Sequence, residues 1–296
     1  MADTEPWQWD PTLYEGSAPY YAVGRVQYPA EVGAVLRDEL ALDGTGRLLD
    51  TGCGPGPFAL LLSGLFAEVV GVDADPGMIE EADRQGRAAG AGNVRWVCTR
   101  AESLPSAGLG TFRVASLAQS FHWMDRPLVA AILLDLLDPG GAVVHVGAWT
   151  HRGMGSEDDL PGPATPWDRI DELVASYLGP VRRAGRGILP AGTASDEDEV
   201  FPAAGFAGPT RITVDWKEPF VRSEDEIVAS VFSLSSATPH LFGARMAAFE
   251  HDLRSLLRRA SATGEYWERA ADVSLTIWTK PPKPEPRIQP SPTIRP

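Results

Sequence analysis

Cysteine is nearly absent from this chain of 296 residues, which contains only Cys53 and Cys98. Two cysteines cannot build a disulfide framework. No cluster of cysteine and histidine has the spacing of a zinc site, so we expect no metal. Such sparse cysteine is typical of a reducing compartment, and we therefore expect a cytoplasmic protein.

Long hydrophobic runs are also lacking. The longest uncharged stretches, residues 51–67 and 227–244, are interrupted by glycine, proline or polar residues. Neither is a continuous apolar span of about 20 residues, the length that crosses a bilayer. The acidic first ten residues contain no basic region followed by an apolar stretch, so we expect neither a signal peptide nor a membrane partner.

Basic residues are outnumbered by acidic ones, 26 to 40, which gives a net charge of −14. This charge repels a phosphate backbone, so nucleic acid is not expected as the main partner. The hydrophobic fraction of 44% is that of a globular protein rather than a disordered chain. The length indicates one large domain, or one domain with a substantial insertion.

Predicted strands and helices alternate between residues 40 and 150. The strands are expected at residues 47–51, 67–73, 94–99, 112–119 and 142–149. Asp75-Pro76 is a typical helix start, because aspartate caps the helix and proline suits its first position. An alternation of this kind predicts an α/β fold with a doubly wound parallel sheet.

The second half of the chain has a different pattern. Capping boxes at Thr165 and Ser223 predict helix starts, and a longer helix is expected at residues 244–260. Further strands are expected at residues 210–216 and 273–279.

A glycine-rich loop follows the first predicted strand, with glycine at positions 52, 54 and 56. Glycine allows a tight turn and lets a ligand approach the backbone, as at the nucleotide-binding edge of α/β sheets. Asp73 ends the next strand, where a carboxylate can accept the hydrogens of two ribose hydroxyls. A dinucleotide fingerprint needs glycine where Pro57 stands, so a nicotinamide oxidoreductase is the weaker alternative.

Five segments occur in an order that is typical of one family. They are residues 48–56, 69–78, 100–105, 118–123 and 137–141. Together they resemble the motifs of class I S-adenosylmethionine-dependent methyltransferases, and residues 118–123 resemble the trans-aconitate methyltransferase-like subgroup. The resemblance implies a Rossmann-like sheet of seven strands in the order 3-2-1-4-5-7-6, with the last strand antiparallel and helical cap insertions.

Three parts of the chain are expected, the first two from the resemblance and the last from its composition. Residues 1–44 would form an N-terminal helical cap, and residues 45–280 the methyltransferase domain, with cap elements at about 151–200 and 223–260. Residues 281–296, rich in proline, would form a disordered tail.

By the same resemblance, the cofactor would be S-adenosyl-L-methionine and the product S-adenosyl-L-homocysteine. Asp50 would either contact the methionine end or only order the loop. Arg100 stands where many relatives have aspartate, so the adenine contacts are expected from the backbone of Ala101 and from Glu102 instead. The residues expected at the cofactor are Tyr21, Arg25, Asp50, Gly52, Cys53, Gly54, Gly56, Asp73, Ala74, Met78, Ala101, Glu102, Gln119, Ser120 and His122.

Three histidines are candidates for a general base, because a neutral imidazole accepts a proton near pH 7. They are His122, His151 and His240. His122 can instead be a packing residue beside Trp123, and this interpretation is the favoured one. A base is needed only for a weakly acidic acceptor such as an alcohol or phenol, and a carboxylate needs none.

The expected reaction is in-line transfer of a methyl group to an oxygen, nitrogen or carbon nucleophile of a small molecule. The enzyme would be a monomer or a homodimer. Two alternatives stay open: a lyase or cyclase that keeps the cofactor without transferring its methyl group, and a non-catalytic binding protein.

Overall fold

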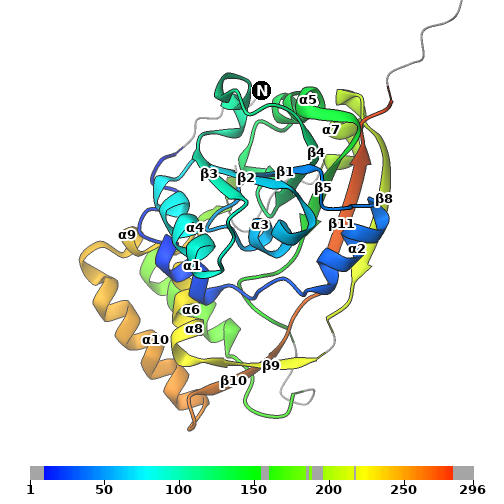
Figure 1. The fold of residues 1–296 in the computed structure, drawn as a ribbon. Helices are drawn as coiled ribbons and strands as arrows, with labels where there is room; N and C mark the ends of the chain where they lie inside the picture. Colours follow the sequence, from blue (N-terminus) through cyan, green and yellow to red (C-terminus); the bar gives the residue numbers. More distant parts are fainter. Residues whose placement is uncertain (1–9, 155–159, 185–186, 189–195, 217, 283–296) are drawn as a thin grey trace, which may run out of the picture.

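The computed structural model describes residues 10–154, 160–184, 187–188, 196–216 and 218–282. The tail expected from residue 281 onward lies almost entirely outside the described residues, as do parts of the cap element at 151–200. In the described part, no helix combines the length and the apolar character needed to cross a membrane. A twisted sheet with helices on its faces adjoins a separate group of helices (Figure 1).

The central sheet has the predicted strand order. Strands β1 to β5 are parallel, and β11 is antiparallel to its neighbours β5 and β8. The order β3-β2-β1-β4-β5-β11-β8 confirms the expected 3-2-1-4-5-7-6 arrangement with an antiparallel last strand. The strands are β1 Arg47–Thr51, β2 Glu68–Asp73, β3 Val94–Cys98, β4 Phe112–Ala118, β5 Leu137–Gly147, β8 Ala207–Val214 and β11 Val273–Thr279.

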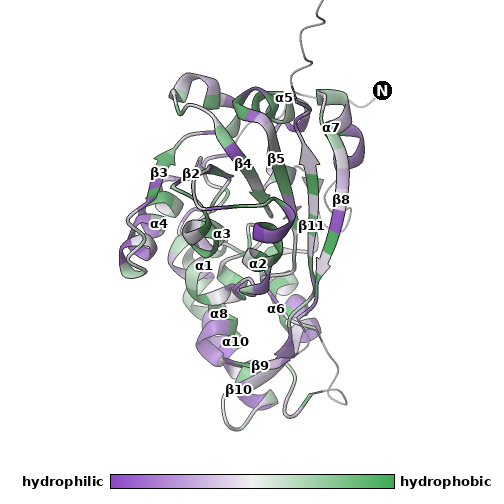
Figure 2. Ribbon diagram, turned by 45° about the vertical axis from the view of Figure 1, so that its right-hand side comes forward, coloured by the Kyte–Doolittle hydropathy of each residue, from purple (hydrophilic) through white to green (hydrophobic). Residues whose placement is uncertain are grey.

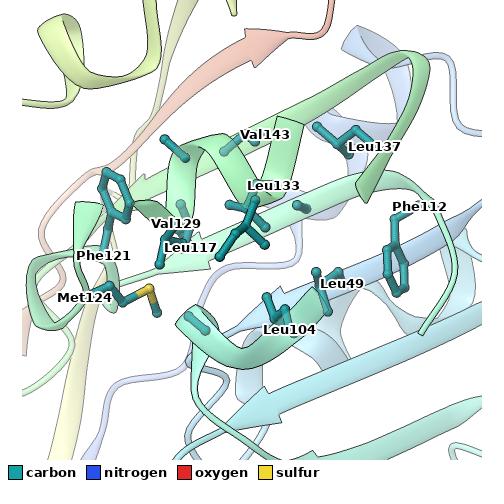
Figure 3. Close-up of a cluster of buried hydrophobic side chains, with 14 of the residues drawn as sticks. Leu49, Leu104, Phe112, Leu117, Phe121, Met124, Val129, Leu133, Leu137 and Val143 are labelled. Carbon is teal, nitrogen blue, oxygen red and sulfur yellow. The ribbon is translucent and has the colours of Figure 1, made fainter. Parts of the chain in front are cut away.

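Both faces of the sheet are covered, because side chains alternate along each strand. In β1, Leu48 and Leu49 are both fully buried but belong to different apolar clusters. The cluster with Leu48 includes side chains of α2 (Glu31–Glu39) and α3 (Pro57–Leu62). The cluster with Leu49 includes side chains of α5 (Arg126–Leu136) and α7 (Glu197–Ala204), as the close-up of this core shows in part (Figure 3).

A second group of helices forms what we call the helical lobe. It consists of α1 (Ala18–Gly24), α6 (Trp167–Leu178), α8 (Glu224–Phe232), α9 (Pro239–Phe242) and α10 (Met246–Ala260). Its own apolar core includes Phe232, Phe242 and Phe249. Hydrophilic residues are prominent along α10, whereas β5 is largely hydrophobic (Figure 2). The lobe adjoins the sheet through α1, which contacts α4 (Pro76–Ala88) as well as α8.

Several local predictions hold and others are corrected. Asp75 caps α4, and Ser223 and Glu226 form the expected capping box of α8. The box expected at Thr165 does not form, because α6 begins after Pro166 without a side-chain cap. Strand β5 begins at Leu137, before the expected start, and a shift in its pairing with β4 accommodates the turn residues.

One antiparallel pair was not predicted. Strands β9 (Pro219–Ser223) and β10 (Glu265–Arg269) pair along five residues each. They are separated in the sequence by α8, α9 and α10, so the sequence has no hairpin turn between them that would predict their pairing.

Candidate functional site

The loop after β1 is tied to β2 by three backbone donors. The N–H groups of Gly52 and Cys53 both donate to the carbonyl oxygen of Val72, at 2.8 and 2.9 Å. The N–H group of Gly54 donates to Asp73 Oδ2 at 2.9 Å. The loop therefore lies at the carboxyl end of β2, where α/β sheets bind ligands.

The three glycines of this loop are required for different reasons. All three have positive φ, which glycine adopts without strain. A Cβ on Gly52 would lie 2.5 Å from Ser120 Cβ, and a Cβ on Gly56 would lie under 3.0 Å from the indole of Trp96. A Cβ on Gly54 would meet no atom within 4 Å. Gly54 therefore borders open space, whereas Gly52 and Gly56 are packed against side chains.

Asp73 is held with its carboxylate at the loop. Its Oδ1 accepts the N–H group of Asp75 at 2.9 Å, while Oδ2 accepts that of Gly54. Burial raises the pKa of Asp73 to about 6, although these two hydrogen bonds act in the opposite direction. A carboxylate offers about four lone-pair sites, so both oxygens can accept further hydrogen bonds.

A cavity of about 310 Å³ opens between the loop, the end of β2 and the N-terminal segment. Its volume is in the range of small-molecule sites. It is lined by many of the residues expected at the cofactor, namely Tyr21, Arg25, Gly52, Cys53, Gly54, Asp73, Ala74, Met78, Ala101, Glu102, Gln119 and Ser120. The fold thus brings together, around one cavity, residues from five separate segments of the chain.

Aromatic residues of the N-terminal segment form one wall of the cavity. Tyr14 contacts Trp123 edge to face, with ring centroids 5.9 Å apart, and both residues line the cavity. Tyr28 lines it as well and packs on Phe58. Tyr14, Tyr28 and Trp123 are not among the residues expected at the cofactor, although the tyrosines at positions 14, 20, 21 and 28 are a sequence signal for an aromatic wall.

Arg25 is fixed along the same wall. Its guanidinium lies 4.3 Å from the centre of the Tyr21 ring, the geometry of a cation–π contact. Nε and Nη2 donate to Ser233, at its hydroxyl and carbonyl oxygens, and Nη1 donates to Thr150 Oγ1. Three donors of the fork are thereby bound to α8 and to the segment after β5, which orients Arg25 at the cavity.

A buried ion pair between β9 and β10 anchors the end of α1. Arg222 Nη2 donates to the carbonyl oxygen of Gly24 at 2.6 Å, and Nη1 lies 3.5 Å from Glu268 Oε2. Glu268 also accepts the N–H group of Gly153 and the indole N–H of Trp167, both at 2.8 Å. Arg222 and Glu268 are only 3% and 2% exposed, and several partners satisfy their charges, as buried charges require.

Asp50, Gly56 and His122, also expected at the cofactor, do not line the cavity. Asp50 is fully buried behind the loop, where its Oδ1 accepts the hydroxyl of Ser116 at 2.7 Å. Burial raises the pKa of Asp50 to about 7, and the charge of Asp73 acts in the same direction. This location favours the interpretation that Asp50 orders the loop.

The three histidines considered as bases lie in the described part of the chain, and none of them lines the cavity. Burial lowers the pKa of His122 to about 4, with His145 and Arg126 adding to the effect. Burial and three arginines lower the pKa of His151 to about 3. His240 lies 3.1 Å from Thr238 Oγ1 in the helical lobe. Imidazoles with pKa values so far below 7 are weak proton acceptors.

Two other polar side chains of the cavity are engaged with the protein. Glu102 Oε1 accepts the N–H group of Asp125 at 2.9 Å, and Oε2 pairs with Arg100 at 3.3 Å. Burial raises the pKa of the Cys53 thiol well above its ordinary value, so this residue is neutral and packs within the loop. Neither side chain is arranged as a nucleophile with an adjacent base.

Comparison with known proteins decides the family. Residues 48–141 match the model of a methyltransferase domain. Ubiquinone biosynthesis O-methyltransferase of Cereibacter sphaeroides is 33% identical over 180 residues, which cover 55% of this chain and 72% of that protein. This chain belongs to the class I S-adenosylmethionine-dependent methyltransferases. S-adenosylmethionine is accordingly the cofactor of this methyltransferase.

Other relatives match shorter parts of the methyltransferase. The chain spans only 19% and 24% of the length of an uncharacterised RNA methyltransferase of Thermosynechococcus vestitus and the biotin biosynthesis protein BioHC of Cellvibrio japonicus. Trans-aconitate 2-methyltransferase of an Enterobacter species is 39% identical over 79 residues, 25% of this chain and 27% of that protein.

Solved structures share the fold of the methyltransferase. The YcgJ protein of Bacillus subtilis has a TM-score of 0.50 and 18% identity, with 86% of this chain and 99% of that chain covered. A type II methyltransferase structure from Anaeromyxobacter dehalogenans has a TM-score of 0.50 and 22% identity, with 86% and 96% covered.

Proposed function

We propose that this enzyme methylates a small molecule, with cofactor and acceptor meeting in the cavity between the glycine loop and the N-terminal aromatic wall. Bound S-adenosylmethionine supplies a methyl group activated by a sulfonium centre. The observation that carries the proposal is the convergence of the Gly52–Gly54 loop, Asp73 and the aromatic wall on one cavity.

The cavity residues fit the parts of this cofactor. The carboxylate of Asp73 retains lone pairs for two ribose hydroxyls, and the open space at Gly54 allows a ligand to approach the backbone. Ala101 and Glu102, after β3, would border the adenine. Arg25, held by Ser233 and Thr150, would face the methionine carboxylate.

Two properties of the enzyme support a small acceptor. The cavity is bordered by the N-terminal segment, which Arg222 of β9 anchors at Gly24, and it has the dimensions of a small-molecule site. The net charge of −14 disfavours nucleic acid. The names of two relatives refer to ubiquinone biosynthesis and to trans-aconitate, which agrees with a small acceptor.

The protein's contribution to the reaction would be alignment and exclusion of water. Positioning two reactants can lower a barrier by about 7–11 kcal/mol, so no base is required for an acceptor that is already nucleophilic. The low pKa values of His122 and His151 agree with a reaction of this kind.

A labelling experiment tests the proposal. The purified enzyme is incubated with methyl-labelled S-adenosylmethionine and, separately, a deproteinised small-molecule extract, total RNA and denatured protein. We expect label in the small-molecule fraction together with one equivalent of S-adenosylhomocysteine. Asp73→Ala, which removes the carboxylate from the cavity, serves as the control.

Two results would contradict the proposal. Label confined to RNA or protein would exclude a small acceptor. Conversion of extract components without S-adenosylhomocysteine would instead indicate a lyase or cyclase that retains the cofactor.

A further inference from the structure

Trp96 occupies a slot formed by glycines of three different elements. It lies on β3 opposite Gly71 of β2 in the parallel pairing. A Cβ on Gly71 or on Gly56 would lie under 3.0 Å from the indole, and a Cβ on Gly86 of α4 would lie 3.2 Å from its Nε1. The indole therefore fills space that any side chain at Gly56 or Gly71 would need.

This slot lies directly beneath the cofactor loop. Gly56 ends the loop and is the N-cap of α3, with a φ of +86°. The N–H group of Gly56 donates to the carbonyl oxygen of Cys53 at 3.0 Å, which closes the turn. Trp96 itself does not line the cavity, so any influence on the cofactor must pass through the loop.

The loop is thus anchored at both ends, with Gly54 between the anchors. At its start, Gly52 and Cys53 donate to Val72 of β2. At its end, Gly56 lies against the Trp96 indole. Close-packed contacts resist displacement, because a gap of less than 1 Å already forfeits much of the dispersion energy. The two anchors together determine where the Gly54 N–H group meets Asp73.

We propose that Trp96 is a positioning residue for cofactor binding, which sets the height of the Gly52–Gly56 loop over β2. The inference rests on the proposed cofactor site at Gly54 and Asp73. Loss of the indole removes the support of Gly56 and lets the N-terminus of α3 settle toward β3. The Gly54 N–H group then moves relative to Asp73, and both lose their alignment toward the ligand.

Calorimetric titration with S-adenosylhomocysteine tests this role in the full chain. We expect Trp96→Leu to weaken binding at least about tenfold, equivalent to about 1.4 kcal/mol. Trp96→Phe, which keeps part of the ring, should have a smaller effect. The matched control is Trp278→Leu, because Trp278 is equally large, is only 1% exposed and packs in the core around Leu49. The control should lose stability to urea while keeping its affinity.

A second substitution tests the slot itself. The Cβ of Gly71→Ala falls where the indole lies, so this change alone should weaken binding. In the Trp96→Leu background, the same methyl group enters space that the indole has left, with Cys53 Sγ still 3.1 Å away, and should recover part of the affinity. A merely destabilising role for Trp96 predicts that the methyl group restores stability to urea and leaves the affinity of the folded protein unchanged.

The possible outcomes are distinguishable. If wild-type protein does not bind S-adenosylhomocysteine, the proposed cofactor site fails. If wild type binds and folded Trp96→Leu binds within twofold of it, or Trp278→Leu loses as much affinity, only the role of Trp96 is overturned. If Trp96→Leu does not fold, Trp96→Phe decides, and an unchanged dissociation constant overturns the role.

Discussion

The N–H group of Gly54 and Oδ2 of Asp73 are 2.9 Å apart, so one hydrogen bond joins the loop after β1 to the end of β2. The same two residues line the cavity. The bond couples the position of the loop to the ionisation of the carboxylate, because an ionised carboxylate is the stronger acceptor. Loop geometry and cofactor affinity should therefore respond to the same changes.

Cofactor affinity should depend on the ionisation of Asp73. Its pKa is about 6, so S-adenosylhomocysteine should bind with constant affinity above pH 7. Below pH 6 the proton must be displaced, and affinity should fall by up to about tenfold per pH unit. Titrations between pH 5 and pH 8 measure this, and Asp73→Asn should bind at least about tenfold more weakly at pH 8 with a flatter profile.

The Asp83→Asn variant of α4 is the control, because Asp83 forms a surface ion pair with Arg87 and does not line the cavity. It should follow the wild-type profile. A wild-type affinity that does not change between pH 5 and pH 8 would rule out titration of Asp73 in binding.

Asp50 should make the folded protein less stable as the pH rises. Its pKa is about 7 in the folded chain and about 3.9 in the unfolded chain, so the folded state holds a proton that the unfolded state releases. Below pH 4, Asp50 is protonated in both the folded and the unfolded chain, so stability does not depend on its ionisation there. Stability is lost as the pH rises from 4 to 7, by about 1.4 kcal/mol per unit and about 4 kcal/mol in all.

Asp50→Asn removes this loss, because the amide does not ionise and still offers an oxygen to Ser116. Urea unfolding of both proteins should show that the free energy of unfolding of the variant rises relative to that of wild type between pH 4 and pH 8. A stability difference that is the same at every pH would show that Asp50 is not protonated in the folded chain.

Alanine substitutions of the loop glycines should affect cofactor affinity and folding stability to different extents. Gly54→Ala places a methyl group in open space beside the cavity, so it should weaken S-adenosylhomocysteine binding and cost about 1–2 kcal/mol of stability from the left-handed backbone. Gly52→Ala adds a collision with Ser120 and should cost about 3 kcal/mol or more. Urea unfolding and calorimetry measure the two effects.

Gly90→Ala supplies the reference for backbone strain. Gly90 has a φ of +67°, and a Cβ there would meet nothing within 4 Å. It should lose stability like Gly54→Ala but keep full affinity. Equal affinities for the Gly54 and Gly90 variants would argue against a ligand at Gly54.

His122→Gln should keep at least about a third of wild-type turnover. Loss of a general base would instead lower turnover by about 100-fold or more. The reason is its position outside the cavity and its pKa of about 4. The rate is measured with the acceptor from the labelling experiment, alongside cofactor affinity and urea stability. A hundredfold loss of turnover with both controls intact would instead assign His122 the role of base.

Much of the central fold follows from local patterns. Parallel strands buried on both faces have continuous apolar runs, as in β2, and glycines follow β1 where the chain must turn sharply. The strand order came from the resemblance of these motifs. Strands β9 and β10 were missed, because their pairing depends on the packing of three intervening helices.

The sequence by itself determined the α/β class, the glycine loop and the acidic residue at the end of β2, because backbone preferences and side-chain periodicity act over a few neighbouring residues. Only the tertiary structure decided that Tyr14 meets Trp123, that Arg222 binds Gly24, and that the histidines lie outside the cavity. Such contacts join residues far apart in the chain, and they depend on how complete elements pack. The location of Trp96 beneath the loop belongs to the same class, since three elements must assemble before its slot exists.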